Sequence, residues 1–293
     1  MAETKKKQHL NIMTVRGILA EKDLEIKQTR TGKTYISGNI VVKTGENALH
    51  KFKVNTYELK KDGTVNGMYT GLVTSMNEHK SIASHGEEAD AVEVKAQFDI
   101  EDYKGRDGNM VNFTSKVVNG ITRISKEKLE PKADGTAHVF IEKTRMEVTR
   151  DGDETGRGVI SGYVRKFNGE FIPVEFKIAI PEGVERFVNG DITRGELWEL
   201  NFELVNQTIK RTTIKEMAFG KPKEEIFERT VNEIIIYSGV PEEEAHLIYS
   251  TEDFNKALVE RELKLKEIEN GTGSTGATPA QANKPKVVDD FVF

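Results

Sequence analysis

Cysteine is absent from this chain of 293 residues, and proline occurs only seven times. The lack of cysteine excludes disulfide bonds, thiolate metal sites and cysteine nucleophiles, and it is typical of proteins from a reducing compartment. The sequence also lacks an apolar run long enough to span a membrane, and no apolar segment follows its basic start as in a signal peptide. We therefore expect a globular cytoplasmic protein.

Catalytic motifs are equally scarce. The six histidines are scattered, with no metal-ligand spacing beyond the loose pair His79 and His85. Residues 31–34 are similar to the end of a phosphate-binding loop, but the upstream glycine is missing and a strand follows instead of a helix. Four carboxylates could be imagined to bind a cation, although a solvated hairpin turn explains them as well: Asp99, Glu101, Asp102 and Asp107. We expect no enzymatic activity, no cofactor and no bound metal.

The net charge of −5 is not spread evenly along the chain. Residues 221–293 hold 9 Lys and Arg against 15 Asp and Glu, whereas the first 220 residues hold 34 against 33. A domain that is neutral as a whole can still carry a basic groove. The acidic total therefore does not exclude a nucleic-acid partner for the first 220 residues.

One stretch of the sequence, residues 31–54, occurs twice. A shift of 124 positions superimposes it on residues 155–178 with nine identities in 24 positions and no gap. The identical residues are Thr31, Gly32, Ile36, Ser37, Gly38, Gly45, Glu46, Phe52 and Lys53. A period this long is not that of a solenoid. We interpret it as two copies of one domain, and the chain is long enough for each copy to have its own core.

The first copy has the pattern of a small β-barrel. Apolar and polar residues alternate in five segments, which we expect to be strands: 11–27, 35–43, 50–59, 91–103 and 110–124. Five short strands with an irregular piece between the third and fourth match the OB-fold, a five-stranded Greek-key barrel. An immunoglobulin-like sandwich is the alternative, but it usually needs about seven strands.

The second copy repeats this order, followed by a helix and a tail. Its strands are expected at 139–150, 158–167, 171–180 and 196–205, with a closing strand or hairpin over 208–217 and 226–237. The prediction is a mainly β chain of two tandem OB-fold-like barrels plus a C-terminal helix and a disordered acidic tail. The expected boundaries are 1–124 with an insertion in 60–90, a linker at 125–136, the second barrel at 137–240, the helix at 241–270 and the tail at 271–293. Pro241 is expected at the helix start, and large aromatic residues in the cores: Phe52, Phe98, Phe176, Trp198 and Phe202.

The outward faces of the second and third strands of each copy interleave aromatic and basic residues. Aromatic rings stack on bases and cations pair with phosphates, so such a strip suits single-stranded nucleic acid. Exposed lysines alone are also ordinary protection against aggregation. The candidate residues of the first copy are Tyr35, Asn39, Lys43, Lys51, Lys53 and Tyr57, with Lys27, Arg30 and Lys33 in the flanking turn. Those of the second copy are Arg157, Tyr163, Arg165, Phe167, Phe171 and Lys177.

The end of the chain is the second functional signal. Asp289 and Asp290 precede Phe291, Val292 and Phe293 after a Gly/Ser/Thr-rich linker. This tip resembles the C-terminal tip of bacterial single-stranded DNA-binding proteins and of T7-like phage ones, in which acidic residues precede a terminal Phe that docks into partner proteins. The sequence departs from that pattern in having only two Asp and no Pro before the last Phe. The resemblance implies that Asp289, Asp290, Phe291 and Phe293 recruit partners.

Together these features predict a protein that binds single-stranded DNA without sequence preference in replication, recombination and repair of a bacterium or a phage-infected cell. The expected partners are single-stranded DNA and, through the tip, other replication or recombination proteins. The chain would act as a monomer or a weak homo-oligomer. Two alternatives remain open at this point: a scaffold or virion module built from duplicated β-barrels, and an RNA-binding or strand-annealing protein that uses the same grooves.

Overall fold

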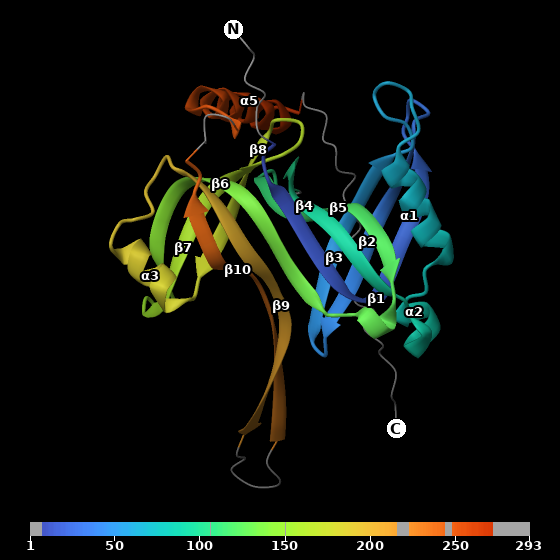
Figure 1. Ribbon diagram of the computed structural model, residues 1–293, viewed down its shortest axis with the longest axis horizontal. Helices are drawn as coiled ribbons and strands as arrows, with labels where there is room; N and C mark the ends of the chain where they lie inside the picture. Colours follow the sequence, from blue (N-terminus) through green and yellow to red (C-terminus); the bar gives the residue numbers. More distant parts are fainter. Residues whose placement is uncertain (1–7, 106, 150, 216–222, 244–247, 272–293) are drawn as a thin grey trace.

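The computed structural model describes residues 8–105, 107–149, 151–215, 223–243 and 248–271, with side chains for all of these except 209–229. Ten strands and a few helices make up this part of the chain, which is mainly β. The strands form one continuous hydrogen-bonded sheet that closes on itself twice. Figure 1 shows the result as two barrels side by side, the first blue to teal and the second green to orange.

The first barrel, barrel 1, has the strand order of an OB-fold. β1 pairs antiparallel with β2 and β4, β2 with β3, and β4 with β5, while a parallel contact between β3 and β5 closes the ring. The strands are β1 (Asn11–Gln28), β2 (Thr34–Gly45), β3 (Ala48–Tyr57), β4 (Ala91–Lys104) and β5 (Met110–Ile124). These bounds agree with the five segments expected from the alternating pattern.

The second barrel, barrel 2, repeats the same pairing. β6 pairs antiparallel with β7 and β9, β7 with β8, and β9 with β10, and a parallel contact between β8 and β10 closes the ring. The strands are β6 (Lys132–Val148), β7 (Glu154–Arg165), β8 (Phe171–Ile178), β9 (Leu197–Lys215) and β10 (Lys223–Pro241). The expectation of two tandem five-stranded barrels is therefore confirmed.

Short helices lie between the third and fourth strands of each barrel. The insertion expected in barrel 1 contains α1 (Gly67–Glu78), α2 (Ile82–His85) and the 3-10 turn η1 (Gly86–Glu88), whereas barrel 2 has only α3 (Pro181–Val188). The Lys22 ammonium donates to the carbonyl oxygens of Ser75 and Met76 in the last turn of α1. A cation at that end satisfies carbonyl groups that have no partner within the helix. The turn η2 (Lys126–Lys128) follows β5.

Two expected boundaries were wrong. β6 begins at Lys132, inside the segment 125–136 expected as a linker, because Lys132–Ala137 pairs with β1. Pro241 does not start the C-terminal helix but ends β10, and α5 (Thr251–Glu269) begins ten residues later. Ser250 starts that helix, since its side chain accepts from the Asp253 amide in a capping box. In addition, β9 and β10 are each a single long strand, and beyond Thr208 of β9 they pair only with each other among the described residues.

The duplicated glycines have a structural reason. Gly32 and Gly156 have φ of +78° and +75° in the turns before β2 and β7, a conformation that other residues rarely adopt. A Cβ on Gly38 would lie 1.8 Å from the Asp23 carbonyl oxygen, and one on Gly162 would lie 2.6 Å from the Phe140 carbonyl oxygen. Gly38 and Gly162 of the repeat therefore lie where the first strand of each barrel passes close to the second.

The hydrophobic core is continuous across both barrels, contrary to the expectation of two separate cores. The ring of Phe98 from β4 lies 6.0 Å from that of Phe176 and 5.5 Å from that of Phe202, both in barrel 2. β1 also pairs with β6, so the two barrels share a ladder as well as a core. All the aromatic residues expected in the core are buried, including Phe52 and Trp198.

α5 lies above barrel 2 in Figure 1 and contacts β4 of barrel 1 as well as β8 of barrel 2. Phe254 near its start packs against barrel 2, and Arg261 further along pairs with Asp102 on β4 of barrel 1. No helix in the described part of the chain is both long and apolar enough to cross a membrane.

Candidate nucleic-acid interface

The outer face of β2 and β3 carries a row of polar and aromatic side chains. Every second residue along the middle of both strands is buried in the core, so the residues between them face outward. The register places Tyr35 opposite Tyr57 and Asn39 opposite Lys53. We call this row the barrel-1 strip, and it consists of Tyr35, Asn39, Lys51, Lys53, Asn55 and Tyr57.

Two tyrosines form the aromatic end of the barrel-1 strip. The ring centroids of Tyr35 and Tyr57 lie 5.6 Å apart at an interplanar angle of 45°. Tyr57 is 46% exposed, so its ring is open to solvent. An aromatic ring held by a neighbouring ring and open to solvent is a ready stacking surface for a base.

Several cations around the barrel-1 strip have no counter-ion. Arg30 and Lys33 are exposed in the turn between β1 and β2, and Lys51 is exposed on β3. Lys43 is partly exposed near the far end of β2. None of the four is in an ion pair within the described part of the chain, so each can pair with a phosphate without first breaking a salt bridge.

Other predicted cations are already paired. Lys53 binds Glu101 of β4 at 2.6 Å, and Lys27 binds Glu25 at 2.9 Å. The outer row of β1, which runs beside β2, is acidic and exposed: Glu21, Asp23 and Glu25. This row repels phosphates, so the open path for an anion follows β2 and β3 and not β1.

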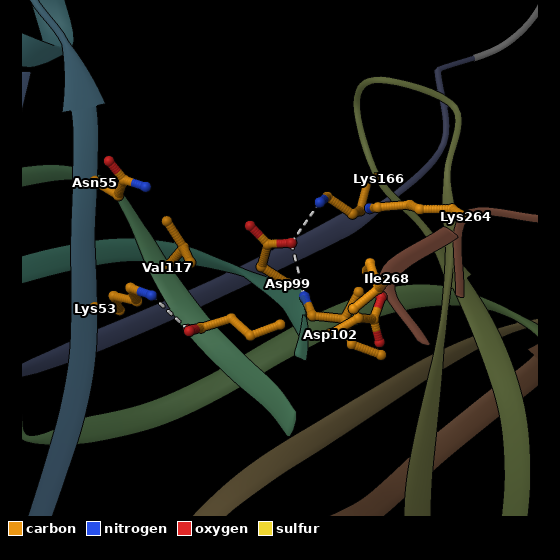
Figure 2. A pocket seen from close by; sticks show the side chains of 10 residues that line it. Lys53, Asn55, Asp99, Asp102, Val117, Lys166, Lys264 and Ile268 are labelled. Atoms are coloured by element: carbon orange, nitrogen blue, oxygen red, sulfur yellow. Dashed lines mark hydrogen bonds and ion pairs between the residues drawn. The ribbon is translucent and has the colours of Figure 1, made fainter. Parts of the chain in front are cut away.

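A cavity of about 180 Å³ lies beside Lys53 and Asn55 of the barrel-1 strip (Figure 2). Lys53 and Asn55 line it from β3, Lys166 from the turn between β7 and β8, and Lys264 from α5. Its other lining residues are Asp99, Ile100, Glu101, Asp102, Val117 and Ile268. The cavity therefore joins the outer face of barrel 1, the edge of barrel 2 and the C-terminal helix.

Three of the four carboxylates named above as a conceivable cation site form ion pairs within the protein. Asp99 pairs with Lys166, and Arg261 donates two hydrogen bonds of 2.8 and 2.9 Å to Asp102. Only Asp107 fits a solvated hairpin turn, where it accepts from Asn109. Because Asp99, Glu101 and Asp102 are each paired with a lysine or arginine, they do not form an open metal site.

The equivalent face of barrel 2 is covered, which contradicts the expectation of an open strip there. Phe171 is 1% exposed and packs edge-on against Phe254 at 5.0 Å and Tyr249 at 4.8 Å between ring centroids. The Tyr163 ring lies 5.3 Å from that of Phe254. Both predicted stacking residues point outward from the barrel, as expected, but the C-terminal segment occupies the space in front of them.

The neighbouring residues Arg165 and Phe167 differ in whether the C-terminal segment covers them. The guanidinium of Arg165 lies 5.8 Å from the centroid of the Tyr249 ring, so it is also engaged by the C-terminal segment. Phe167, in the turn between β7 and β8, is 89% exposed. Of the predicted aromatic residues on barrel 2, Phe167 alone is open to solvent in the described structure.

Two predicted cations of barrel 2 are neutralised by carboxylates. Arg157 and Lys177 both pair with Glu147 and Glu233, at distances of 2.5 to 2.9 Å. Burial raises the pKa of Glu147, but hydrogen bonds from Lys177, Arg157 and Thr155 outweigh it and hold the pKa at about 2. Two positive and two negative charges cancel, so this cluster offers little attraction to a phosphate.

One buried histidine lies beside two carboxylates. His138 Nε2 lies 3.5 Å from an oxygen of Glu199 and 3.5 Å from one of Glu242. The Leu10 amide donates to Nδ1 at 3.0 Å, so in the neutral ring Nε2 carries the proton. A metal ion would need the lone pair of Nε2, and the geometry therefore favours a structural contact with the carboxylates over metal binding.

Sequence reasoning missed Lys166, Lys264 and the covering role of α5. Lys166 directly precedes the predicted Phe167 but carried no alternation signal, and Lys264 lies on a helix that was given no place in the site. The tip residues Asp289, Asp290, Phe291 and Phe293 lie outside the described residues.

Comparison with known proteins gives distant structural likenesses, including the following two, and a family match. The wild-type single-stranded DNA-binding protein from Thermus aquaticus is 10% identical, with a TM-score of 0.45 over 80% of this chain and 94% of that chain. A replication protein A heterotrimer bound to single-stranded DNA is 8% identical, with a TM-score of 0.21 over 89% of this chain and 71% of that chain. At such scores neither likeness identifies what this chain binds.

No curated protein matches the chain in sequence. The YorF family matches it over residues 9–271, which includes both barrels and α5. The chain is a member of the YorF family.

Proposed function

We propose that this protein binds single-stranded DNA without sequence preference through the barrel-1 strip. The observation that carries the proposal is the open Tyr35–Tyr57 pair, which continues along the same face of β3 into Asn55 and Lys53. The four unpaired cations around it supply phosphate contacts. Because an OB-fold serves many functions, the proposal rests on these side chains and not on the fold.

The energetics favour an unpaired strand. Stacking on an aromatic side chain is worth roughly 1–3 kcal/mol per base and needs a free base face, which a duplex does not offer. Each phosphate contact on a single strand changes log K by about −0.7 per decade of salt. With three or four such contacts, binding should weaken markedly between low and moderate salt. Neither term depends on base identity, so the binding should tolerate any sequence.

In a cell this activity would protect exposed strands during replication, recombination or repair in a bacterium or phage-infected host. The acidic tip would recruit partner proteins, and the chain itself would act by binding and not by catalysis. The same strip could bind RNA, which makes RNA binding an outcome of the test. A barrel scaffold that binds only proteins would not need unpaired cations beside exposed tyrosines.

The proposal predicts that changing both Tyr35 and Tyr57 to Ala weakens binding to oligo(dT) by tens-fold or more, because two stacking surfaces are lost. Binding is measured by fluorescence titration. The matched control is Tyr237→Ala, since Tyr237 is 49% exposed but lies on β10 outside the strip. Circular dichroism should show the same β content for all three proteins.

Equal affinities of the double variant and the wild type would refute the barrel-1 strip as the binding site. An equal loss in the Tyr237→Ala control would show that exposed aromatic residues act by a general effect and not through this strip.

A further inference from the structure

The C-terminal segment places aromatic rings where bases would stack on barrel 2. Phe254 lies on Phe140 with centroids 3.9 Å apart and planes tilted by 25°, a parallel stack like that of a base on a ring. The same ring contacts Tyr163 and Phe171 edge-on. Tyr163 and Phe171 lie on β7 and β8, the strands that correspond to β2 and β3 of the barrel-1 strip, and Phe140 lies beside Tyr163 on β6.

The contact between this segment and barrel 2 buries polar atoms that form no hydrogen bond in the described structure. The Tyr249 hydroxyl and the Arg165 Nε atom are buried, and neither has a hydrogen-bond partner in the described structure. A buried polar atom without a partner destabilises the contact that buries it. Release of the segment would let both atoms bind water or a phosphate.

Ion pairs at one residue connect α5 to the edge of barrel 2. Glu170 accepts from Lys264 of α5 at 2.8 Å and lies 3.9 Å from Arg261. It also pairs with Lys166 at 3.1 Å. Lys166 and Lys264 line the cavity beside Lys53 and Asn55 of the barrel-1 strip. Lys166 is also held by Asp99, whereas Lys264 is 49% exposed, so a phosphate backbone that entered this cavity would compete with Glu170 for Lys264.

We infer that residues 248–269 are a displaceable internal competitor that covers a second stacking surface for nucleobases, formed by Phe140, Tyr163 and Phe171. This inference rests on the proposed function. A strand bound along barrel 1 reaches the cavity, draws Lys264 away from Glu170, and loosens α5. The uncovered rings then take further bases, so a long strand occupies more nucleotides than barrel 1 alone can bind.

The test compares Glu170→Gln with Glu175→Gln in the full chain. Both changes remove one negative charge from barrel 2, but Glu175 is half exposed and pairs with Arg145, away from α5. Titration of poly(dT) measures the occluded length, and an oligo(dT) of about thirty nucleotides measures affinity. Glu170→Gln should bind at least roughly fivefold tighter than the control, the equivalent of one stacked base, and occlude a longer stretch.

Two further measurements separate release of α5 from simple charge gain. Tyr163→Ala added to Glu170→Gln should cancel the increase in affinity, and hydrogen exchange of the wild type should show α5 amides losing protection on saturation with poly(dT). A gain that persists without Tyr163, or α5 amides that keep their protection, would overturn the inference. If binding depends on Tyr57 while α5 stays protected, the proposed function stands and only the inference fails. If the wild type binds no strand, both fail.

Discussion

The predicted binding lysines and arginines of the two barrels differ mainly in whether a carboxylate neutralises them. Arg30, Lys33 and Lys51 on barrel 1 have no counter-ion in the described structure, whereas Arg157 and Lys177 on barrel 2 share two carboxylates. A phosphate that approaches the second pair must displace those carboxylates and gains little. The residue types are alike, but of these five residues only Arg30, Lys33 and Lys51 can pair with a phosphate without first breaking a salt bridge.

The cluster of Arg157, Lys177, Glu147 and Glu233 on barrel 2 makes the free energy of unfolding depend on pH in the acidic range. Hydrogen bonds hold the pKa of Glu147 at about 2, below its ordinary 4.5. Since the folded pKa is the lower one, the contribution of Glu147 to stability is complete above pH 4.5 and is lost as the pH falls toward 2. It amounts to at most about 3 kcal/mol. Glu147→Gln should therefore lower the free energy of unfolding at pH 7 and reduce its fall between pH 7 and pH 3, as measured by urea titration.

The control for that prediction is Glu175→Gln, which removes a carboxylate that is 51% exposed and paired with Arg145 at the surface. Exposed pairs contribute about 1 kcal/mol or less, so its pH profile should follow the wild type. A Glu147→Gln profile parallel to that of the wild type would contradict the assigned role of Glu147.

At the scale of elements, the close approach of two strands explains the duplicated Gly38 and Gly162. It predicts that a substitution at Gly38 affects stability differently from one at an unobstructed glycine. Gly38→Ala should destabilise the protein by roughly 2 kcal/mol or more, because its Cβ would overlap the Asp23 carbonyl oxygen and its φ is +142°. Gly71→Ala in α1 should instead stabilise by about 0.5–1 kcal/mol, since nothing lies within 4 Å of its Cβ and alanine favours a helix.

Thermal or urea unfolding of the two variants measures both effects. A Gly38→Ala variant as stable as the wild type would contradict the close contact between β1 and β2. A destabilised Gly71→Ala variant would show that α1 is packed on the side described as open.

The alternating pattern was enough to predict the strands and both barrels, because alternation reports which side of a strand faces its own core. It could not predict what covers the other side. Tyr163 and Phe171 alternate as outward residues, and they are outward, yet a segment about 80 residues further along the chain packs on them. The start of that segment was misplaced for a similar reason, since Pro241 suits both a helix start and the end of an edge strand.

For the whole molecule, the pairing of β1 with β6 and the contacts of Phe98 with Phe176 and Phe202 make the two barrels one folded body. The repeat in the sequence shows that a unit was duplicated, but it carries no record of how the copies pack. Long-range contacts of this kind depend on surfaces that look like ordinary strand faces in each copy. The separate cores expected from the repeat were wrong for that reason.

A shared core predicts cooperative unfolding. Differential scanning calorimetry of the full chain should show one main transition with a calorimetric enthalpy close to the van't Hoff enthalpy, because barrel 2 cannot unfold without exposing Phe98 and the β1 ladder. Two resolved transitions, each with the enthalpy of one barrel, would contradict the account of a continuous core.

The central claim is that the barrel-1 strip binds single-stranded DNA. Its most direct test is a fluorescence titration with a labelled oligo(dT) of about thirty nucleotides at about 50 and 200 mM salt, beside the same length of duplex and of oligo(U). The account predicts tight binding to the DNA single strand that weakens with salt, and little binding to the duplex. Equal or tighter binding to oligo(U) would assign the strip to RNA, and no binding to any single strand at low salt would contradict the claim.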